Sequence, residues 1–487
     1  MIFIARQGDP FIPVIMNPFI RSLFLVLSFS WISQMLPAQE FRTWTDSTGK
    51  YQIDAAFGGV ENGNVKLLKR DGSSTMVPFV KFSPADQQLL RTLVQPQRPA
   101  PATPAVGNAG YGWPTFAGPN GNWTSPDTGL LSEFPADGPK VLWKIPLGTG
   151  FSGLVVGNGR LYTVFGRDGR ETVGCFDAKT GKEIWAVDSD ADFAEGRSHG
   201  PRATPALDGN RLITVGASGQ VMCLDAASGK KAWDFNLYGK FSMEPHNEGL
   251  SPSPLLDGQN VILCGGKSAF AINKASGEVA WRALEDKWNH STPVFAIIGG
   301  KRQLVTLTGH NLVGLDPLDG SELWRAEQRG VNAASPVVGP GGKVFGAASY
   351  GFGCQLVQVS GGSATRVYKR NELATHHATA LLHNGYLYGF HDRPGRFKCI
   401  ELDTGAEQWE AGPRDMQKGK MVMADGKFFI LTESGDLYIV PVSPQQFQST
   451  GYARRVLTGQ SFTAPTLVGG ILYIRTDKEM AAVDLRG

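Results

Sequence analysis

One short pattern recurs along most of this chain and limits what the chain can fold into. It runs from a small apolar residue through an acidic residue and a glycine to a tryptophan, as in CLDAASGKKAW, which ends at Trp233. The acidic landmark lies eight residues before the tryptophan and recurs every 40 to 48 residues, at Asp177, Asp225, Asn273, Asp316, Ser360, Glu401, Pro441 and Asp484. A repeat of this period, built from short apolar strands and glycine turns, predicts a β-propeller with one four-stranded blade per repeat.

The repeats predict eight blades in a closed ring. The eighth copy stops at Gly487 before it reaches a tryptophan, while the segment VLWKIPL, with Trp143, precedes the first complete copy. We therefore expect this N-terminal strand to complete the eighth blade, because a closed ring leaves no long sheet edge exposed. The predicted fold class is all-β: an eight-bladed β-propeller over residues 111–487, preceded by a small β-barrel.

The repeated segment has a structural interpretation. Asp225 can begin a turn by hydrogen bonding to its own backbone, and Gly229 supplies the positive φ that a tight hairpin requires. The tryptophan is expected to lay its ring on the neighbouring blade and to bury about 150–250 Å² there. A catalytic residue is not needed once per blade, so we interpret these tryptophans as structural: Trp143, Trp185, Trp233, Trp281, Trp324 and Trp409.

Three segments precede the repeats. From Met16 the chain has one arginine, an apolar run and Pro37-Ala38, which indicates a secretory signal peptide over residues 1–38 and export to the periplasm or the cell surface. Residues 39–94 alternate apolar and polar side chains around two hairpin signals, Asn62-Gly63 and Asp71-Gly72, and end in a short helix capped by Ser83. This pattern predicts the small barrel, and residues 95–110 form a Pro-rich linker.

Charge and cysteine content exclude several kinds of partner. The net charge is +3 and no run is rich in lysine or arginine, so nucleic acid is not expected to bind. The five cysteines include no CxxC pair, and Cys175, Cys223 and Cys399 occupy the small apolar position of the repeat. We interpret them as buried structural thiols rather than disulfides or metal ligands. No membrane span is expected in the mature form: the alternative of an uncleaved anchor is disfavoured, because Ser28, Ser30, Ser33 and Gln34 interrupt the apolar run of the leader before it reaches about 20 residues.

The pattern A-x-D-x-x-T-G-K-x-x-W resembles the pyrroloquinoline quinone (PQQ) repeat, over the whole repeat region. That family includes the quinoprotein alcohol dehydrogenases and BamB of outer-membrane assembly, so the resemblance implies the fold but not one activity. Residues 39–94 resemble the SH3-like SLA homology domain in the pattern W-T-D-x-T-G-K, a DG turn, V-P and S-x-x-D. The eukaryotic relatives of that domain imply recognition of NPF-type peptides.

The resemblance to the dehydrogenases also implies features that this sequence does not carry. Those enzymes are expected to hold the quinone against two adjacent cysteines, with a Glu/Asn/Asp calcium set and an aspartate base. The sequence has no Cys-Cys pair and no CxxCH haem motif. Against BamB, it lacks a lipid-anchor cysteine and adds the SH3-like domain.

A candidate ligand site follows from the symmetry of the repeats. Positions at the start of the innermost strand of each blade converge on the ring axis: Phe151, Arg202, Ser251, His290, Ala333, His377, Lys418 and Phe462. With three residues from the preceding positions, we predict a ligand site of Arg202, Asn289, His290, Asn332, His376, His377 and Lys418. Arginine, lysine and histidine favour an anionic ligand, such as PQQ, an acidic peptide or a sugar. The alternative is a set of solvated residues that line a wet channel.

A second candidate site lies in the loop EPHNEGLSPSP, over residues 244–254. It offers enough oxygen for calcium, with Glu248 and Asn247 as the predicted ligands, and the alternative is a solvated turn. Two further histidines, His310 and His391, are predicted to lie in surface turns.

These observations leave three classes of function open. The preferred class is an exported, non-catalytic binding or scaffold protein with no assigned cofactor, whose partner is a protein, a peptide, or an anionic small molecule or polymer. The second is a PQQ- and calcium-dependent dehydrogenase in which the basic residues of the site hold the cofactor. The third is a polysaccharide-binding propeller, which would use aromatic residues at the channel mouth: Phe151, Trp288, Tyr350 and Phe462.

The leader gives a first testable prediction. When the protein is expressed from Met1 in a bacterium with a periplasm, we expect N-terminal sequencing of the periplasmic form to begin at Gln39, because the small residue Ala38 directly precedes the predicted cut. Ala38→Arg should block this cleavage, while Gln39→Asn should leave it unchanged. Recovery of an uncut chain in the cytoplasm would contradict the prediction.

Overall fold

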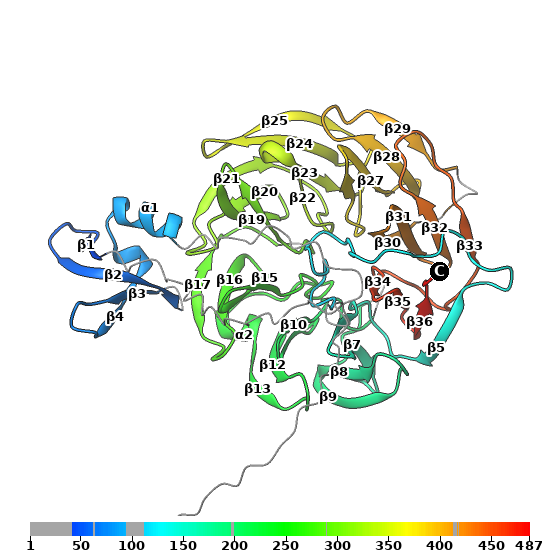
Figure 1. The fold of residues 1–487 in the computed structure, drawn as a ribbon, viewed down its shortest axis with the longest axis horizontal. Helices are drawn as coiled ribbons and strands as arrows, with labels where there is room; N and C mark the ends of the chain where they lie inside the picture. Colours follow the sequence, from blue (N-terminus) through cyan, green and yellow to red (C-terminus); the bar gives the residue numbers. More distant parts are fainter. Residues whose placement is uncertain are drawn as a thin grey trace, which may run out of the picture.

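The computed structural model describes residues 41–61, 64–93, 112–195, 199–288, 290–412, 416 and 418–487. The predicted signal peptide (1–38), the linker (95–110), the Asn62-Gly63 turn and Asn289 lie outside the described residues. Eight four-stranded antiparallel sheets are arranged as the blades of a ring, and a ninth sheet belongs to the N-terminal domain (Figure 1). The predicted fold class is confirmed.

The N-terminal domain is a four-stranded meander with one helix. Its elements are β1 (Phe41–Thr45), β2 (Gln52–Glu61), β3 (Asn64–Leu68), β4 (Ser74–Pro78), the 3₁₀ turn η1 (Phe79–Lys81) and α1 (Pro84–Leu93). A fifth pairing is limited to the bridge between Asp46 and Phe82. Ser83 caps α1 as expected, since its Oγ accepts from the Asp86 backbone N–H at 3.2 Å and donates to the Asp86 carboxylate at 2.9 Å. Trp44 is buried at the centre of this small core.

The first four blades follow in chain order, each with its innermost strand first. Blade 1 contains β6 (Val155–Gly157), β7 (Arg160–Arg167), β8 (Arg170–Asp177) and β9 (Glu183–Ala191). Blade 2 contains β10 (Ala206–Asp208), β11 (Arg211–Val215), β12 (Gln220–Asp225) and β13 (Lys231–Asn236), followed by the short helix α2 (Leu237–Phe241). Blade 3 contains β14 (Leu255–Asp257), β15 (Asn260–Gly265), β16 (Ser268–Asn273) and β17 (Val279–Ala283). Blade 4 contains β18 (Val294–Ile298), β19 (Lys301–Leu307), β20 (Asn311–Leu315) and β21 (Glu322–Glu327).

The remaining blades complete the ring. Blade 5 contains β22 (Val337–Val338), the 3₁₀ turn η2 (Pro340–Gly342), β23 (Lys343–Ala348), β24 (Gly353–Ser360) and β25 (Ser363–Arg370). Blade 6 contains β26 (Leu381–His383), β27 (Tyr386–His391), β28 (Arg396–Glu401) and β29 (Glu407–Glu410). Blade 7 contains β30 (Gly419–Ala424), β31 (Lys427–Thr432), β32 (Leu437–Pro441) and β33 (Gly451–Ala453). Blade 8 contains β34 (Thr466–Val468), β35 (Ile471–Arg475), β36 (Glu479–Asp484) and β5 (Lys140–Pro146).

The ring closes as the sequence predicts. Strand β5, which precedes blade 1 in the chain, pairs antiparallel with the last strand, β36, and places Trp143 opposite Ala482. Figure 1 shows the C-terminus beside these two strands. Arg475 of blade 8 reinforces the closure from within: its buried guanidinium donates to the carbonyl oxygens of Gly150, Ser152 and Val164 at 2.7–3.0 Å.

Five of the six repeated tryptophans join their own blade to the next one through a hydrogen bond. The indole N–H donates to a backbone carbonyl that follows the landmark of the next blade, at 2.9–3.2 Å: Trp143 to Ala178, Trp185 to Ala226, Trp233 to Lys274, Trp281 to Pro317 and Trp409 to Ser443. The glycine of that next repeat lies directly under the ring. A Cβ at Gly229 would stand 2.8 Å from the Trp185 ring, so this glycine is required by the packing as well as by its φ of 73°.

The repeat of blade 5 has a tyrosine in place of tryptophan and keeps the contact with the next blade through its hydroxyl group. Tyr368, which replaces tryptophan in blade 5, donates its hydroxyl to the Leu402 carbonyl of blade 6 at 2.9 Å. Trp324 is the exception, because its indole donates to the side chain of Gln303 in its own blade at 2.7 Å. Gly314 faces Trp324 across the strands and leaves room for the ring there.

Three of the cysteines occupy the small apolar position that lies two residues before the landmark of each repeat, and the packing there explains why they are buried. Cys175, Cys223 and Cys399 are fully buried, and each is directly opposite its own blade's tryptophan in the strand register. All five cysteines are free thiols. Their interpretation as small buried apolar residues is confirmed.

The tryptophan–glycine contact can be tested with two glycines that share a positive φ. Gly277→Ala should destabilise the protein by about 2–4 kcal/mol, because the new Cβ meets the Trp233 ring at 2.9 Å. Gly258→Ala should cost only about 1–2 kcal/mol, since its φ of 54° is strained for alanine but nothing lies within 4 Å. Thermal unfolding of the two variants gives the comparison, and equal losses would contradict the packing role.

Candidate functional site

The channel mouth at the ring axis holds a cavity of about 470 Å³. Seven of the eight symmetry-equivalent positions identified in the sequence line it: Phe151, Arg202, Ser251, His290, Ala333, His377 and Phe462. These positions meet because the innermost strand of each blade begins at the same end of the ring. Of the preceding positions, His376 also faces the cavity.

Lys418 does not line the cavity, and Lys420 takes its place. The innermost strand of blade 7, β30, is six residues long and carries Lys420 within the strand. The Nζ atom of Lys418 turns instead to the buried carboxylate of Asp392, at 2.8 Å. The register assigned from sequence is correct, because Lys418 and Arg202 each lie six residues before the end of the innermost strand, at Ala424 and Asp208. Lys418 is absent from the wall because its side chain turns to Asp392, and Lys420 enters the wall two residues further along.

Of the two predicted asparagines, the structure describes Asn332, and this residue does not line the cavity. Asn332 is fully buried, and its amide donates to the backbone carbonyls of Thr308 and Gln328. It therefore supports the loop before blade 5 rather than facing a ligand. Asn289 lies outside the described residues.

The paired histidines are neutral at physiological pH. Burial lowers the pKa of His376 to about 4, although the carboxylate of Asp392 acts in the opposite direction. Burial also lowers the pKa of His377 well below its ordinary value, with Lys420 and His376 adding to the effect. Both rings can donate and accept hydrogen bonds, but neither supplies the positive charge that the sequence suggested.

The fixed positive charge at the cavity comes from Arg202 and Lys420. Burial lowers the pKa of Arg202, a shift that Glu195 opposes from 3.6 Å, and the guanidinium stays charged. Burial lowers the pKa of Lys420 to about 8, and Glu433 opposes the shift. Because Glu195 and Glu248 also line the cavity, the site is mixed in charge and not the purely basic ring that was predicted.

Aromatic rings cover another part of the wall. Phe151 and Phe462 are in contact, with ring centroids 4.8 Å apart, and His377 meets Phe462 edge-on at 4.5 Å. Tyr350 also lines the cavity. Trp288, predicted as a fourth aromatic residue at the mouth, is instead buried in the core of blades 3 and 4, where its indole donates to Ser291.

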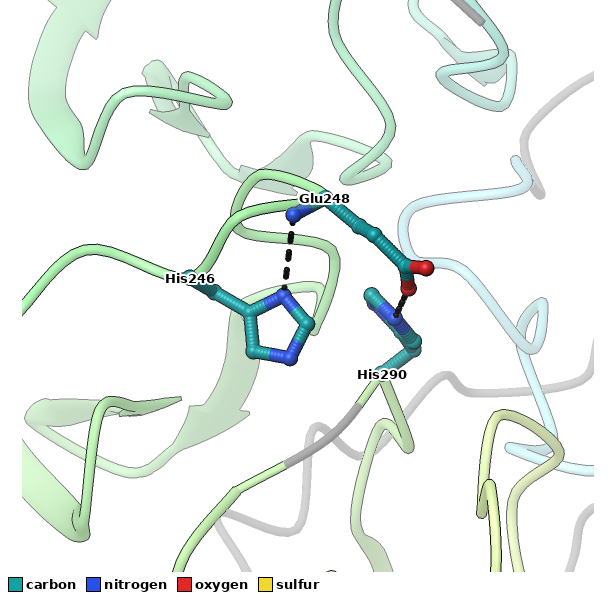
Figure 2. Close-up of side chains that lie close together, drawn as sticks. All are labelled: His246, Glu248 and His290. Carbon is teal, nitrogen blue, oxygen red and sulfur yellow. Dashed lines mark hydrogen bonds and ion pairs between the residues drawn. The ribbon is translucent and has the colours of Figure 1, made fainter. Parts of the chain in front are cut away.

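The loop predicted to bind calcium brings different residues together (Figure 2). The Glu248 carboxylate accepts from His290, with Oε2 2.8 Å from Nε2, and the Glu248 backbone N–H donates to Nδ1 of His246 at 3.2 Å. Asn247 is exposed and does not line the cavity. Calcium prefers an all-oxygen set, so two imidazoles beside one carboxylate do not fit the predicted calcium pair of Glu248 and Asn247.

The predictions for the remaining histidines have different outcomes. His310 is exposed, as expected. The prediction for His391 is wrong, because this ring is buried between Ala374, whose N–H donates to Nδ1 at 3.2 Å, and the Arg393 carbonyl, 3.1 Å from Nε2. The segment after β27 folds back over the ring, which a turn signal in the sequence does not reveal.

The residues around the cavity also do not fit the calcium–quinone arrangement of the dehydrogenases. No cysteine lies among the cavity residues, and each described cysteine is buried inside a blade. The carboxylates present, Glu195 and Glu248, are engaged with Arg202 and His290. We therefore derive no redox step for this site.

These features define a class of protein: a closed eight-bladed propeller with a ligand-sized, mixed-charge cavity at its axis and an added N-terminal β domain. Residues 123–196 and 169–411 match the family described as outer membrane protein assembly factor BamB, and the chain belongs to that family. Residues 33–97 match SLA1 homology domain 1.

Individual relatives are distant. BamB of Moranella endobia (strain PCIT) is 23% identical over 307 residues, which are 61% of this chain and 65% of that protein, so the match spans just under two thirds of the relative. The crystal structure of BamB from Moraxella catarrhalis superimposes with a TM-score of 0.53 at 16% identity, covering 71% of this chain and 99% of that one. Quinohemoprotein alcohol dehydrogenase from Comamonas testosteroni gives 0.55 at 13% identity, with 77% and 81% covered. At these identities the likeness to the solved structures shows the fold alone.

The two lysines of blade 7 give opposite predictions for stability. Lys420→Met should raise the melting temperature at pH 7, because a buried ammonium is removed while an apolar stem remains. The pKa of Lys420 in the folded protein is about 8, against an ordinary value of 10.5. Below pH 8 the ammonium is charged in both the folded and the unfolded protein, so its desolvation lowers the stability of wild type to the full extent. That penalty disappears as the pH rises from about 8 towards 10.5, and the advantage of the variant should shrink accordingly.

Lys418→Met is the matched control. It leaves the buried carboxylate of Asp392 without its 2.8 Å partner and should lower the melting temperature by several degrees at both pH values. Thermal unfolding at pH 7 and pH 9.5 provides the measurement. A Lys420→Met gain that grows with pH would contradict the assignment.

Proposed function

We propose that the chain is an exported, non-catalytic binding protein of the periplasm or cell surface, whose propeller holds a small anionic ligand in the axial cavity. The observation that carries this proposal is the cavity of about 470 Å³, which combines the charged groups of Arg202 and Lys420 with an aromatic wall. Its volume lies within the range of about 300–1,000 Å³ that is common for small-molecule sites.

The composition of the wall favours one kind of ligand. Phe151 and Phe462 offer apolar ring surface, while Arg202 provides a planar donor and Lys420 a compact positive charge. The neutral rings of His376 and His377 can pair with either donors or acceptors. We propose a flat, partly apolar molecule with one or more carboxylate groups, in preference to a long polysaccharide.

The scaffold part of the proposal rests on the family and on the N-terminal domain. The matched relatives are named as outer membrane protein assembly factors, which supports a role in holding protein partners in the periplasm. In the N-terminal domain, Tyr51 and Val80 are 74% and 60% exposed. Tyr51 ends the turn between β1 and β2, and Val80 lies in η1; the hydrogen bond from Ser47 N–H to the Lys81 carbonyl, at 2.7 Å, joins this turn to η1. We propose that this exposed apolar pair contacts a peptide partner. In the described part of the chain, no helix has the length and apolar character needed to cross a membrane.

The ligand proposal is tested with PQQ as a planar tricarboxylate probe, added to the mature protein in a buffer that contains EDTA. We expect saturable binding by calorimetry without any metal, and a rise in melting temperature that corresponds to about 2.7 kcal/mol at a hundred times the dissociation constant. Arg202→Ala should lower the affinity for the probe at least about tenfold, because a charged hydrogen-bond donor is lost from a partly desolvated site.

Arg170→Ala is the control, since its side chain is half exposed on β8 and does not line the cavity. Unchanged affinity in Arg202→Ala would place the probe elsewhere and contradict the proposal. If PQQ binds only with calcium, and the protein with PQQ bound then reduces a dye with an alcohol as the electron donor, the dehydrogenase alternative is established instead.

A further inference from the structure

Two histidines and one glutamate converge at the rim of the axial cavity, from two different loops. His246 and Glu248 belong to the loop between α2 and β14, and His290 belongs to the loop before β18. One ligand atom from each residue lies within 4.8 Å of the other two. Within the described residues, no other group of three histidine, cysteine, aspartate or glutamate side chains comes together in this way.

We propose that His246, Glu248 and His290 bind one divalent transition-metal ion, with zinc as the reference metal. Two imidazoles and one carboxylate suit zinc and its neighbours, whereas calcium and magnesium prefer oxygen donors alone. Three protein ligands also leave a fourth position open, as in zinc sites that bind a water molecule or a substrate.

The contacts around His290 orient the ring for this role. Its Nδ1 lies 2.7 Å from the hydroxyl of Ser251, while its Nε2 points to Oε2 of Glu248 at 2.8 Å (Figure 2). A proton on Nδ1 that is donated to Ser251 would leave the Nε2 lone pair for the metal. A fixed hydrogen bond on the second ring nitrogen is the usual arrangement for a metal-bound histidine.

The three ligand atoms, which lie within 4.8 Å of one another, must move closer together or apart to hold an ion. Tetrahedral zinc, with bonds of about 2.0–2.1 Å, separates its ligand atoms by roughly 3.3 Å. The 2.8 Å contact between Glu248 and His290 must therefore open by about half an ångström, and the ion replaces the proton that the two groups share. His246 gives up one long hydrogen bond of 3.2 Å, from the Glu248 backbone, or turns its ring.

The open position of the ion would face ligands in the cavity. Glu248 and His290 both line the cavity wall, together with Arg202. A carboxylate on a bound molecule could then contact the metal and the guanidinium together. This metal site goes beyond the proposed function, because binding of the anionic probe is expected in EDTA, where no metal is bound.

The proposal is tested by titrating the chelator-treated mature protein with zinc in a calorimeter. We expect one equivalent to bind, and a crystal soaked in zinc to show one anomalous peak between the three side chains. Glu248→Gln, His246→Ala and His290→Ala should each weaken zinc binding by about 100-fold or more, and Ser251→Ala by about tenfold through loss of the orienting hydrogen bond. Glu248 is half exposed, so its variant should keep the fold.

His310→Ala is the matched control, because this exposed histidine is 3.6 Å from Asp286 and outside the cluster. It should bind zinc as wild type does. No saturable zinc binding by wild type, tighter binding of calcium than of zinc, or unchanged affinity in Glu248→Gln and both histidine variants would each overturn the proposal.

Discussion

The pairing of β5 with β36 is the contact on which the axial cavity depends. Lining residues come from loops on most blades around the ring, so their positions are fixed only when the first and last strands are joined. The buried Arg475 ties blade 8 to the segment that carries Phe151, through carbonyl groups on either side of that residue. Around the rest of the circle, tryptophans and the glycines beneath them set the spacing between blades. The repeat performs no chemistry, yet it determines the geometry of the site.

The cavity combines features that work against stability. Burial holds both paired histidines neutral and lowers the pKa of Lys420 to about 8, so the desolvation of these groups is not fully offset by their neighbours. Lys418, two residues away, shows the stabilising alternative, because it is paired with Asp392. Groups held in such an environment are typical of binding sites, where the missing interaction is supplied by a ligand.

Much of the fold and part of the site could be predicted from the sequence. The interval between landmarks determines the number of blades, and the unmatched Trp143 segment reveals the closure, because both follow from counting. Symmetry placed seven of eight axial residues in the cavity wall, but Lys418 turns to Asp392 and Lys420 lines the wall instead, which depends on a side-chain contact with blade 6. The neutral state of His376 and the pairing of His246 with Glu248 and His290 depend on burial and on contacts across 42 residues, which local patterns do not encode.

The closure has a consequence for how the molecule must be made. Lys140 and Asp484, which pair between β5 and β36, are 344 residues apart, so the ring closes through a long-range contact. A polypeptide that emerges N-terminus first can build seven blades before β36 is made, and until then β5 contacts blade 1 through Trp143, whose indole donates to the Ala178 carbonyl. Until β36 pairs with it, β5 leaves unpaired backbone N–H and C=O groups beside Val141 and Leu142, which stay exposed even in the closed ring. That unfinished ring is the species that aggregation would capture and that a chaperone would have to protect.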